Sequence, residues 1–244
     1  MRLFLRILCV TFLGCFSLSK SIAQTCPTGY IATSLNWDNL DFLVQDPTYI
    51  SASKAQNQYF AFGTNKLRIT HNYEITKTLG ETLEHTADVN SNATGSDIGF
   101  TGDGTITISF QAEVRNVKFS LYDIDYRQKV TVTAINGTLP QNVGISKISG
   151  TLLAIAGHNT TSASATASAI AVDNSAHATV NVEITAPVTN ITISITATDI
   201  KNGNPKEDGT FYLSDIYACV NTNDFPINYY SVSKPFTNQP GYIL

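Results

Sequence analysis

The chain has 244 residues, 43% of them hydrophobic and only 14% charged, with a formal net charge of −4 at pH 7. An acidic and lightly charged surface offers no electrostatic attraction for nucleic acid or for an anionic membrane, so neither is expected as a partner. The length is that of one large all-β domain with its own hydrophobic core.

The first residues have the pattern of a secretory signal peptide. Basic residues precede the apolar stretch 7–16, which is too short to span a bilayer, and small residues in 21–23 suit a cleavage site. We therefore predict a signal peptide at 1–23 and a secreted or cell-surface protein that begins at Gln24. A lipoprotein anchored through Cys15 is the alternative. Cleavage removes three bases and no acid, which leaves twelve bases against nineteen acids, a net charge of −7.

The exported chain keeps two cysteines, Cys26 and Cys219. An even number of cysteines in an oxidising compartment predicts one disulfide, which would tie the N-terminal segment to the last strand. The alternative is a pair of buried free thiols.

Alternating apolar and polar residues dominate the exported chain. Valine or isoleucine alternates with polar residues, mostly threonine, in 106–110, 130–133, 180–184 and 191–195. Such runs indicate half-buried antiparallel strands. The predicted fold is all-β, a two-sheet antiparallel β-sandwich with a jelly-roll-like arrangement over 24–222. No segment of the exported chain is long and apolar enough to predict a transmembrane helix.

Segment 105–125 repeats as 179–199 at an offset of 74 residues, with six identities in 21 positions. Each copy reads as a strand, a short Ala-x-Val-x-Asn connection and a second strand. We expect two superimposable antiparallel hairpins, one in each sheet of the sandwich. The side chains expected to lie between the sheets are Ile108, Phe119, Val182 and Ile193.

Two segments lack strand alternation. Small residues fill 160–171, which predicts a long loop or a weak edge strand. The tail 223–244 holds three of the eight prolines and is predicted to be an extended linker.

Three pieces of the sequence carry a resemblance to one class of proteins. They are the P-V-T-N motif at 187–190 together with D-I-D at 123–125, the late strand L-S-D-I-Y-A-C-V at 213–220, and the tail sequence at 228–242. Together they resemble the N-terminal β-sandwich module of bacterial secreted, adhesin-like multidomain proteins of the cell surface. The resemblance implies further domains of the same protein after the tail, and it implies no particular activity.

Three aspartates are candidate site residues. A strand at 117–122 would place Asp123 and Asp125 on its apolar side at the rim of the sandwich, and Asp215 in a later strand could reach the same rim. A carboxylate in that position either accepts backbone hydrogen bonds or binds a hard cation. The interpretations are hydrogen-bonded structural aspartates, a structural Ca²⁺ held by all three carboxylates, or a catalytic role.

Aromatic side chains supply a binding hypothesis, because aromatic rings offer an apolar face on which a sugar can stack. The residues that alternation could place on an outer face are drawn from Trp37, Tyr59, Phe60, Tyr122, Tyr126, Tyr212 and Tyr217. We take Tyr122 and Tyr126 as the candidate ligand-binding residues, and core or rim positions are the alternative.

Sequence patterns of catalysis are missing. The four histidines lack metal-ligand spacing, no G-x-S-x-G motif occurs, and no cysteine of the exported chain is left for nucleophilic chemistry. We expect a non-catalytic binding or adhesive module whose ligand is a glycan or a cell-surface protein, with no cofactor other than structural Ca²⁺. The alternatives are a polysaccharide-active lyase or glycoside hydrolase on a jelly roll, and a purely structural spacer.

Overall fold

The structure is a computed structural model. It describes residues 24–37, 56–72, 74–75, 98–101, 103–124, 128–148, 150–169, 176–197 and 210–223. Every strand pairing among these residues is antiparallel, which confirms the all-β prediction. In this part of the chain no helix has the length and hydropathy needed to cross a membrane.

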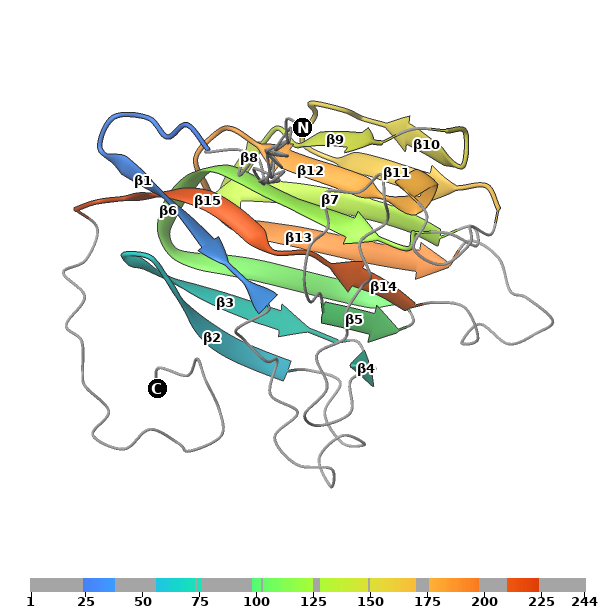
Figure 1. The fold of residues 1–244 in the computed structure, drawn as a ribbon, viewed down its shortest axis with the longest axis horizontal. Coiled ribbons are helices and arrows are strands. Elements are labelled where there is room, and N and C mark those ends of the chain that lie inside the picture. The colour runs from blue at the N-terminus through green and yellow to red at the C-terminus, as the bar shows by residue number, and fades with distance from the viewer. Residues whose placement is uncertain are drawn as a thin grey trace, which may run out of the picture.

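The described strands follow one another along the chain, with the short 3-10 turn η2 between β11 and β12 (Figure 1). They are β1 (Tyr30–Leu35), β2 (Gln56–Phe62), β3 (Asn65–His71), β4 (Glu74–Ile75), β5 (Ile98–Thr101), β6 (Gly104–Tyr122), β7 (Gln128–Asn136), β8 (Leu139–Gln141), β9 (Gly144–Lys147), β10 (Leu153–Ala156), β11 (Ala163–Ala167), η2 (Ala176–Ala178), β12 (Val180–Ile184), β13 (Val188–Ala197), β14 (Thr210–Leu213) and β15 (Ile216–Asn221).

Strand β6 joins two parts of the sheet. Its first arm, 104–111, lies between β3 and β13, and this part, which we call the β13 half, continues through β7 and β11 to β10 and through β3 to β2. Its second arm, 117–122, lies between β12 and β15, and this part, the β15 half, ends at β9 and β1. In Figure 1 the green ribbon of β6 curves round at one end of the molecule and runs back.

One hydrophobic core serves both halves. It contains Ile108 and Ile193 from the β13 half and Phe119 and Val182 from the β15 half, all four buried as expected. The shared core supports the two-sheet, jelly-roll-like sandwich, which stays a prediction.

The bend of β6 lies at 112–116. Asn116 adopts a φ of 51°, a left-handed conformation that asparagine tolerates better than most residues. Buried side chains occupy even-numbered positions in 106–114, except half-buried Ala112, and odd-numbered positions in 117–121. This change of phase keeps apolar side chains in the core on both sides of the bend.

The expected hairpins are wrong, because the arms of each repeat pair with the other copy. Strand β12 pairs with the second arm of β6, with Val182 opposite Phe119, and β13 pairs with the first arm, with Ile191 opposite Ile108. The Ala-x-Val-x-Asn connection lacks the tight glycine-containing turn that a short hairpin needs. The chain therefore makes a wide bend, and the two arms enter different halves.

The small-residue segment 160–171 was expected to be a loop or an edge strand, and this is also wrong. Strand β11 lies between β10 and β7, and its alternate side chains Ala163, Ala165 and Ala167 are buried. Its neighbour β7 supplies the larger apolar side chains Val130 and Val132. Alanine is small enough to leave room for them.

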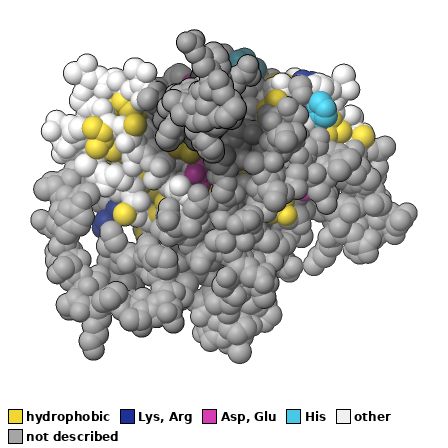
Figure 2. Space-filling view, viewed as in Figure 1, with side chains coloured by type: hydrophobic (Ala, Val, Ile, Leu, Met, Phe, Trp, Pro, Cys, Tyr) yellow, Lys and Arg dark blue, Asp and Glu magenta, His cyan; other side chains and the backbone are white. Residues whose placement is uncertain are grey.

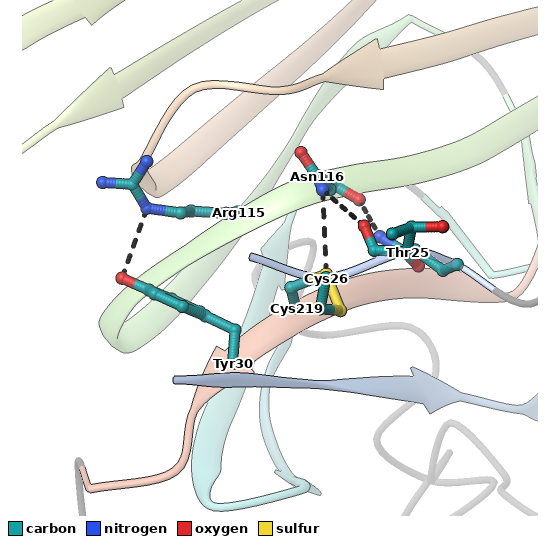
Figure 3. Close-up of a disulfide and its surroundings, with 7 residues drawn as sticks. Thr25, Cys26, Tyr30, Arg115, Asn116 and Cys219 are labelled. Carbon is teal, nitrogen blue, oxygen red and sulfur yellow. Dashed lines mark hydrogen bonds between the residues drawn. A yellow bond between two sulfur atoms is a disulfide. The ribbon is translucent and has the colours of Figure 1, made fainter. Parts of the chain in front are cut away.

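The N-terminal segment is attached by a disulfide to β15, beside the bend of β6 (Figure 3). Cys26 is bonded to Cys219 of β15, with the two Cα atoms 5.6 Å apart, as predicted. Beside it, the Asn116 side-chain amide donates a 3.1 Å hydrogen bond to the backbone oxygen of Thr25. Gln24 donates from its side chain to the backbone oxygen of Asn116. The first described residues therefore lie across the bend of β6.

Candidate functional site

Asp215 is engaged by hydrogen bonds. One carboxylate oxygen accepts a 2.9 Å bond from the backbone N–H of Trp37, and the other accepts a 3.3 Å bond from the hydroxyl of Tyr217. The preceding residue, Ser214, accepts at its backbone oxygen a 2.9 Å bond from the Trp37 indole N–H. This arrangement favours the structural interpretation of Asp215, as an anchor for the segment after β1.

Asp123 lies elsewhere: it follows the end of β6, whereas Asp215 lies between β14 and β15. Leu121 of β6 is opposite Leu213 of β14, and Asp123 and Asp215 lie two residues from this pair in opposite directions. Four residues of strand correspond to about 13 Å, much more than two ligands of one ion span. Asp125 lies outside the described residues, and among the described residues no three His, Cys, Asp or Glu side chains are grouped as metal ligands. The Ca²⁺ site of Asp123, Asp125 and Asp215 stays a prediction. The separation of Asp123 from Asp215 counts against both of them binding the same ion.

Replacing Asp215 by alanine distinguishes these roles. Because the carboxylate accepts hydrogen bonds from Trp37 and Tyr217, we expect Asp215→Ala to lower the free energy of unfolding by about 2 kcal/mol, the range for bonds to a charged group. The loss should be the same with and without a chelator in urea titrations. If chelator lowers the stability of the wild type and not of the variant, the aspartate holds a metal ion instead.

The two tyrosines chosen as ligand-binding residues do not provide an exposed ring in the described part of the chain. Tyr122 is only 5% exposed, so its ring has no free face for a sugar, and this expectation is wrong. Tyr126 lies outside the described residues. Among the described residues, the exposed tyrosines are Tyr59, 53% exposed, and Tyr217, 46% exposed.

The outward side of the β13 half carries two adjoining rows of hydroxyl side chains, which we call the threonine face. The first row crosses four adjacent strands and consists of Thr70, Thr107, Thr192 and Thr133. The second row crosses four strands and consists of Thr105, Ser194, Thr131 and Ser164. All eight side chains are half-buried, and strand geometry spaces them about 4.8 Å across and about 6.7 Å along the strands.

An aromatic ring borders the threonine face. Tyr59 of β2 is opposite Arg68 of β3, which in turn is opposite Ser109 of β6, one step along the strands from the first hydroxyl row. The Arg68 guanidinium carbon lies 5.7 Å from the centroid of the Tyr59 ring. The face thus combines a ring, a cation held against it and an array of hydroxyl groups, all positioned by regular strands.

The outward side of the β15 half has a different character. There Tyr217 is opposite Ser34 on one side and Lys118 on the other, and Lys118 forms a 2.9 Å ion pair with Glu183 of β12. One ion pair thus lies next to the Tyr217 ring, and a second ring of this half, Tyr30 of β1, has the Arg115 guanidinium carbon 5.5 Å from its centroid. No comparable hydroxyl rows follow on the described strands. Figure 2 shows one side of the molecule, on which the coloured charged side chains of described residues are few and scattered.

The described glutamate side chains do not form a facing pair of carboxylates. Glu113 accepts a 3.0 Å hydrogen bond from the Tyr30 hydroxyl and a 3.2 Å bond from the Asn136 amide at the bend of β6. Glu183 is ion-paired with Lys118 on the β15 half. Their contacts hold strands together, which gives them structural roles.

Comparison with known proteins gives no match to a protein-family model and none to a curated sequence. The chemistry of the faces is therefore the basis for a functional conclusion. Sequence reasoning included Tyr59 among the candidate aromatics without choosing it, and it noted the alternating threonines without seeing that they share one face. The T-x-T alternation in neighbouring strands, combined with the register of those strands, could have shown that the threonines share one face and that Tyr59 borders it.

Proposed function

We propose that this chain is a non-catalytic binding module of a secreted or cell-surface protein and that it binds a glycan through the threonine face. The observation that carries the proposal is the exposed Tyr59 ring at the border of two hydroxyl rows. The disulfide supports export, because such bonds persist in oxidising compartments. The resemblance to adhesin-like modules supports the same location and further domains after the tail.

The chemistry of a sugar matches this face. A pyranose ring has an apolar side that stacks on an aromatic ring and a rim of hydroxyl groups that both donate and accept hydrogen bonds. Serine and threonine hydroxyls also donate and accept, and they rotate to suit the partner. Because the strands fix the backbone positions, little order has to be created on binding, which reduces its entropic cost.

Replacing one exposed ring tests the proposal. We expect the whole chain to bind components of a glycan array, and Tyr59→Ala to weaken that binding at least tenfold, about 1.4 kcal/mol. Tyr217→Ala is the matched control, because it removes an exposed ring of similar exposure from the other half of the sheet. It should leave binding within about twofold of the wild type.

Three results would contradict the proposal. Binding that is lost in Tyr217→Ala and kept in Tyr59→Ala would move the site to the β15 half. Release of oligosaccharide from a polysaccharide, lost on replacing one carboxylate, would make the chain an enzyme. No glycan binding in the array and none to insoluble polysaccharide would favour a spacer.

A further inference from the structure

The charges on the threonine face differ in sign from the charge of the whole chain. The sequence contains nineteen acidic and fifteen basic residues. On the outward positions of the described strands of the β13 half, however, the charged residues are Lys66, Arg68 and Lys129, all exposed. Two described acids border this face on β6: exposed Asp103 directly precedes the strand, and Glu113 lies in its bend. Of the other described acids, Asp123 follows the second arm of β6, and Glu183 and Asp215 lie on the β15 half.

From this asymmetry we propose that the threonine face binds an anionic polysaccharide, one that carries carboxylate or sulfate groups along a hydroxyl-rich chain. The inference rests on the proposed function and names the class of its ligand. Complementary charge is the feature that separates this class from neutral glycans.

The positions of the cations indicate a long ligand. Arg68 lies on β3 beside Ser109, and Lys129 lies on β7 beside Thr196, with both hydroxyl rows between them. The two cations are three strands apart across the sheet and six residues apart along the strands. These two separations combine to a diagonal distance of about 25 Å. A small anion contacts only one end of this diagonal, whereas a polymer chain reaches both.

The twist of the sheet indicates a flexible ligand. Neighbouring strands are rotated by about 20–25°, so four strands turn through about 60–75°. A rigid planar surface, such as a crystalline polysaccharide, cannot follow that turn across both hydroxyl rows. A single polysaccharide chain can.

Each group on the face has a part in such a complex. The guanidinium of Arg68 offers parallel N–H donors that match the two oxygens of a carboxylate or sulfate. Its contact with Tyr59 at 5.7 Å places this charge beside an exposed ring, so one sugar unit can meet both. The hydroxyl rows contact the uncharged parts of the following units.

The density of positive charge favours a polysaccharide over a nucleic acid. Over about 25 Å a single nucleic-acid strand carries about seven phosphates, whereas this face provides three cations. Few cations among many hydroxyl groups suit a polymer with widely spaced charges. Nucleic acid is therefore an outcome of the test and not the ligand we propose.

The test compares two polymers of the same backbone, polygalacturonate with free carboxylates and its uncharged, fully methyl-esterified form, with the whole chain as the binding protein. We expect the acid to bind at least about tenfold more tightly than the ester at low salt, measured by affinity electrophoresis or calorimetry. The difference should shrink when NaCl rises from about 0.05 M to about 0.5 M, because salt screens exposed charges. Arg68→Gln should remove about tenfold of the affinity for the acid and Lys129→Gln a smaller part.

Lys118→Gln is the matched control, since Lys118 is an exposed cation on the β15 half. Its affinity for polygalacturonate should stay within about twofold of the wild type. Equal binding of acid and ester, or equal losses in Arg68→Gln and Lys118→Gln, would overturn this inference and leave glycan binding in place. Tighter binding of single-stranded DNA than of polygalacturonate would overturn the choice of a polysaccharide. Failure to bind any polysaccharide would overturn the proposed function as well.

Discussion

Removing the Cys26–Cys219 disulfide is expected to lower the free energy of unfolding by about 4–5 kcal/mol in the chain-entropy account. The bond closes a loop between residues 193 apart, so it excludes a large number of open conformations from the unfolded chain. In the folded chain it attaches the N-terminal segment next to the bend of β6, where Gln24, Thr25 and Asn116 form hydrogen bonds. Both effects are lost in a variant with Cys26→Ala and Cys219→Ala.

The measurement is a denaturant titration of this double variant, of the oxidised wild type and of the wild type under reducing conditions. Alanine suits both positions because Cys219 is fully buried and a hydroxyl there would need a new partner. Cys26→Ala alone is the control: it breaks the bond and keeps the buried thiol, so it should match the double variant. Equal unfolding midpoints for oxidised and reduced wild type would show that pairing of β1 with β15 alone holds the segment.

Local features of the fold were predictable from the sequence. The alternation of Ile106, Ile108 and Phe110 with polar residues predicts a strand with one buried side, and the structure has it. The disulfide followed from counting the cysteines of a chain that the sequence predicts to be exported. Both predictions use information in the local sequence: the strand follows from apolar residues at every second position, and the disulfide follows from the number of cysteines.

Pairing between strands was not predictable in the same way. The repeat of 105–125 in 179–199 looks like two hairpins, because each copy has two apolar runs and a short connection. A strand that bends, such as β6 at Asn116, has the same pattern. Partners of a strand depend on segments far away in the chain, and for β6 these are five other strands.

The site residues show a second limit. Alternation correctly assigns Tyr122 to the side of β6 away from Phe119 and Leu121, but it does not tell what covers that side. At this end of β6 the strand β14 pairs with Tyr122 through Tyr212, and the Tyr122 ring is buried. Asp215 likewise looked like a rim ligand, and its hydrogen bond to Trp37 joins residues 178 positions apart.

Net charge has the same weakness as a guide to partners. The acidic total correctly describes the chain and predicts no attraction for polyanions as a whole. The register of β3 and β7 places Arg68 and Lys129 on one face, where the described acids Asp103 and Glu113 lie only at its borders. Interaction with an extended ligand depends on that face alone, because exposed charges more than about 10 Å away are screened at 0.1 M salt.

The second large effect is expected at Trp37, the only tryptophan of the chain. It is 1% exposed, its ring meets the ring of Phe60 edge-on with centroids 5.6 Å apart, and its indole N–H donates to the backbone oxygen of Ser214. It therefore joins the segment after β1 to β2 and to the junction of β14 and β15. Truncation leaves a large cavity and an unsatisfied carbonyl, so Trp37→Ala should lower the free energy of unfolding by about 3–5 kcal/mol.

Trp37→Phe separates packing from hydrogen bonding. Phenylalanine keeps an aromatic ring next to Phe60 and the backbone N–H that donates to Asp215, and it loses the indole bond to Ser214 and part of the ring volume. A loss of about 1–2 kcal/mol is expected, since one buried hydrogen bond and a small volume are removed. Far-UV circular dichroism follows both variants, because neither keeps a tryptophan signal. If Trp37→Phe is as unstable as Trp37→Ala, the indole hydrogen bond holds this junction. If both match the wild type, the segment after β1 contributes little to the core.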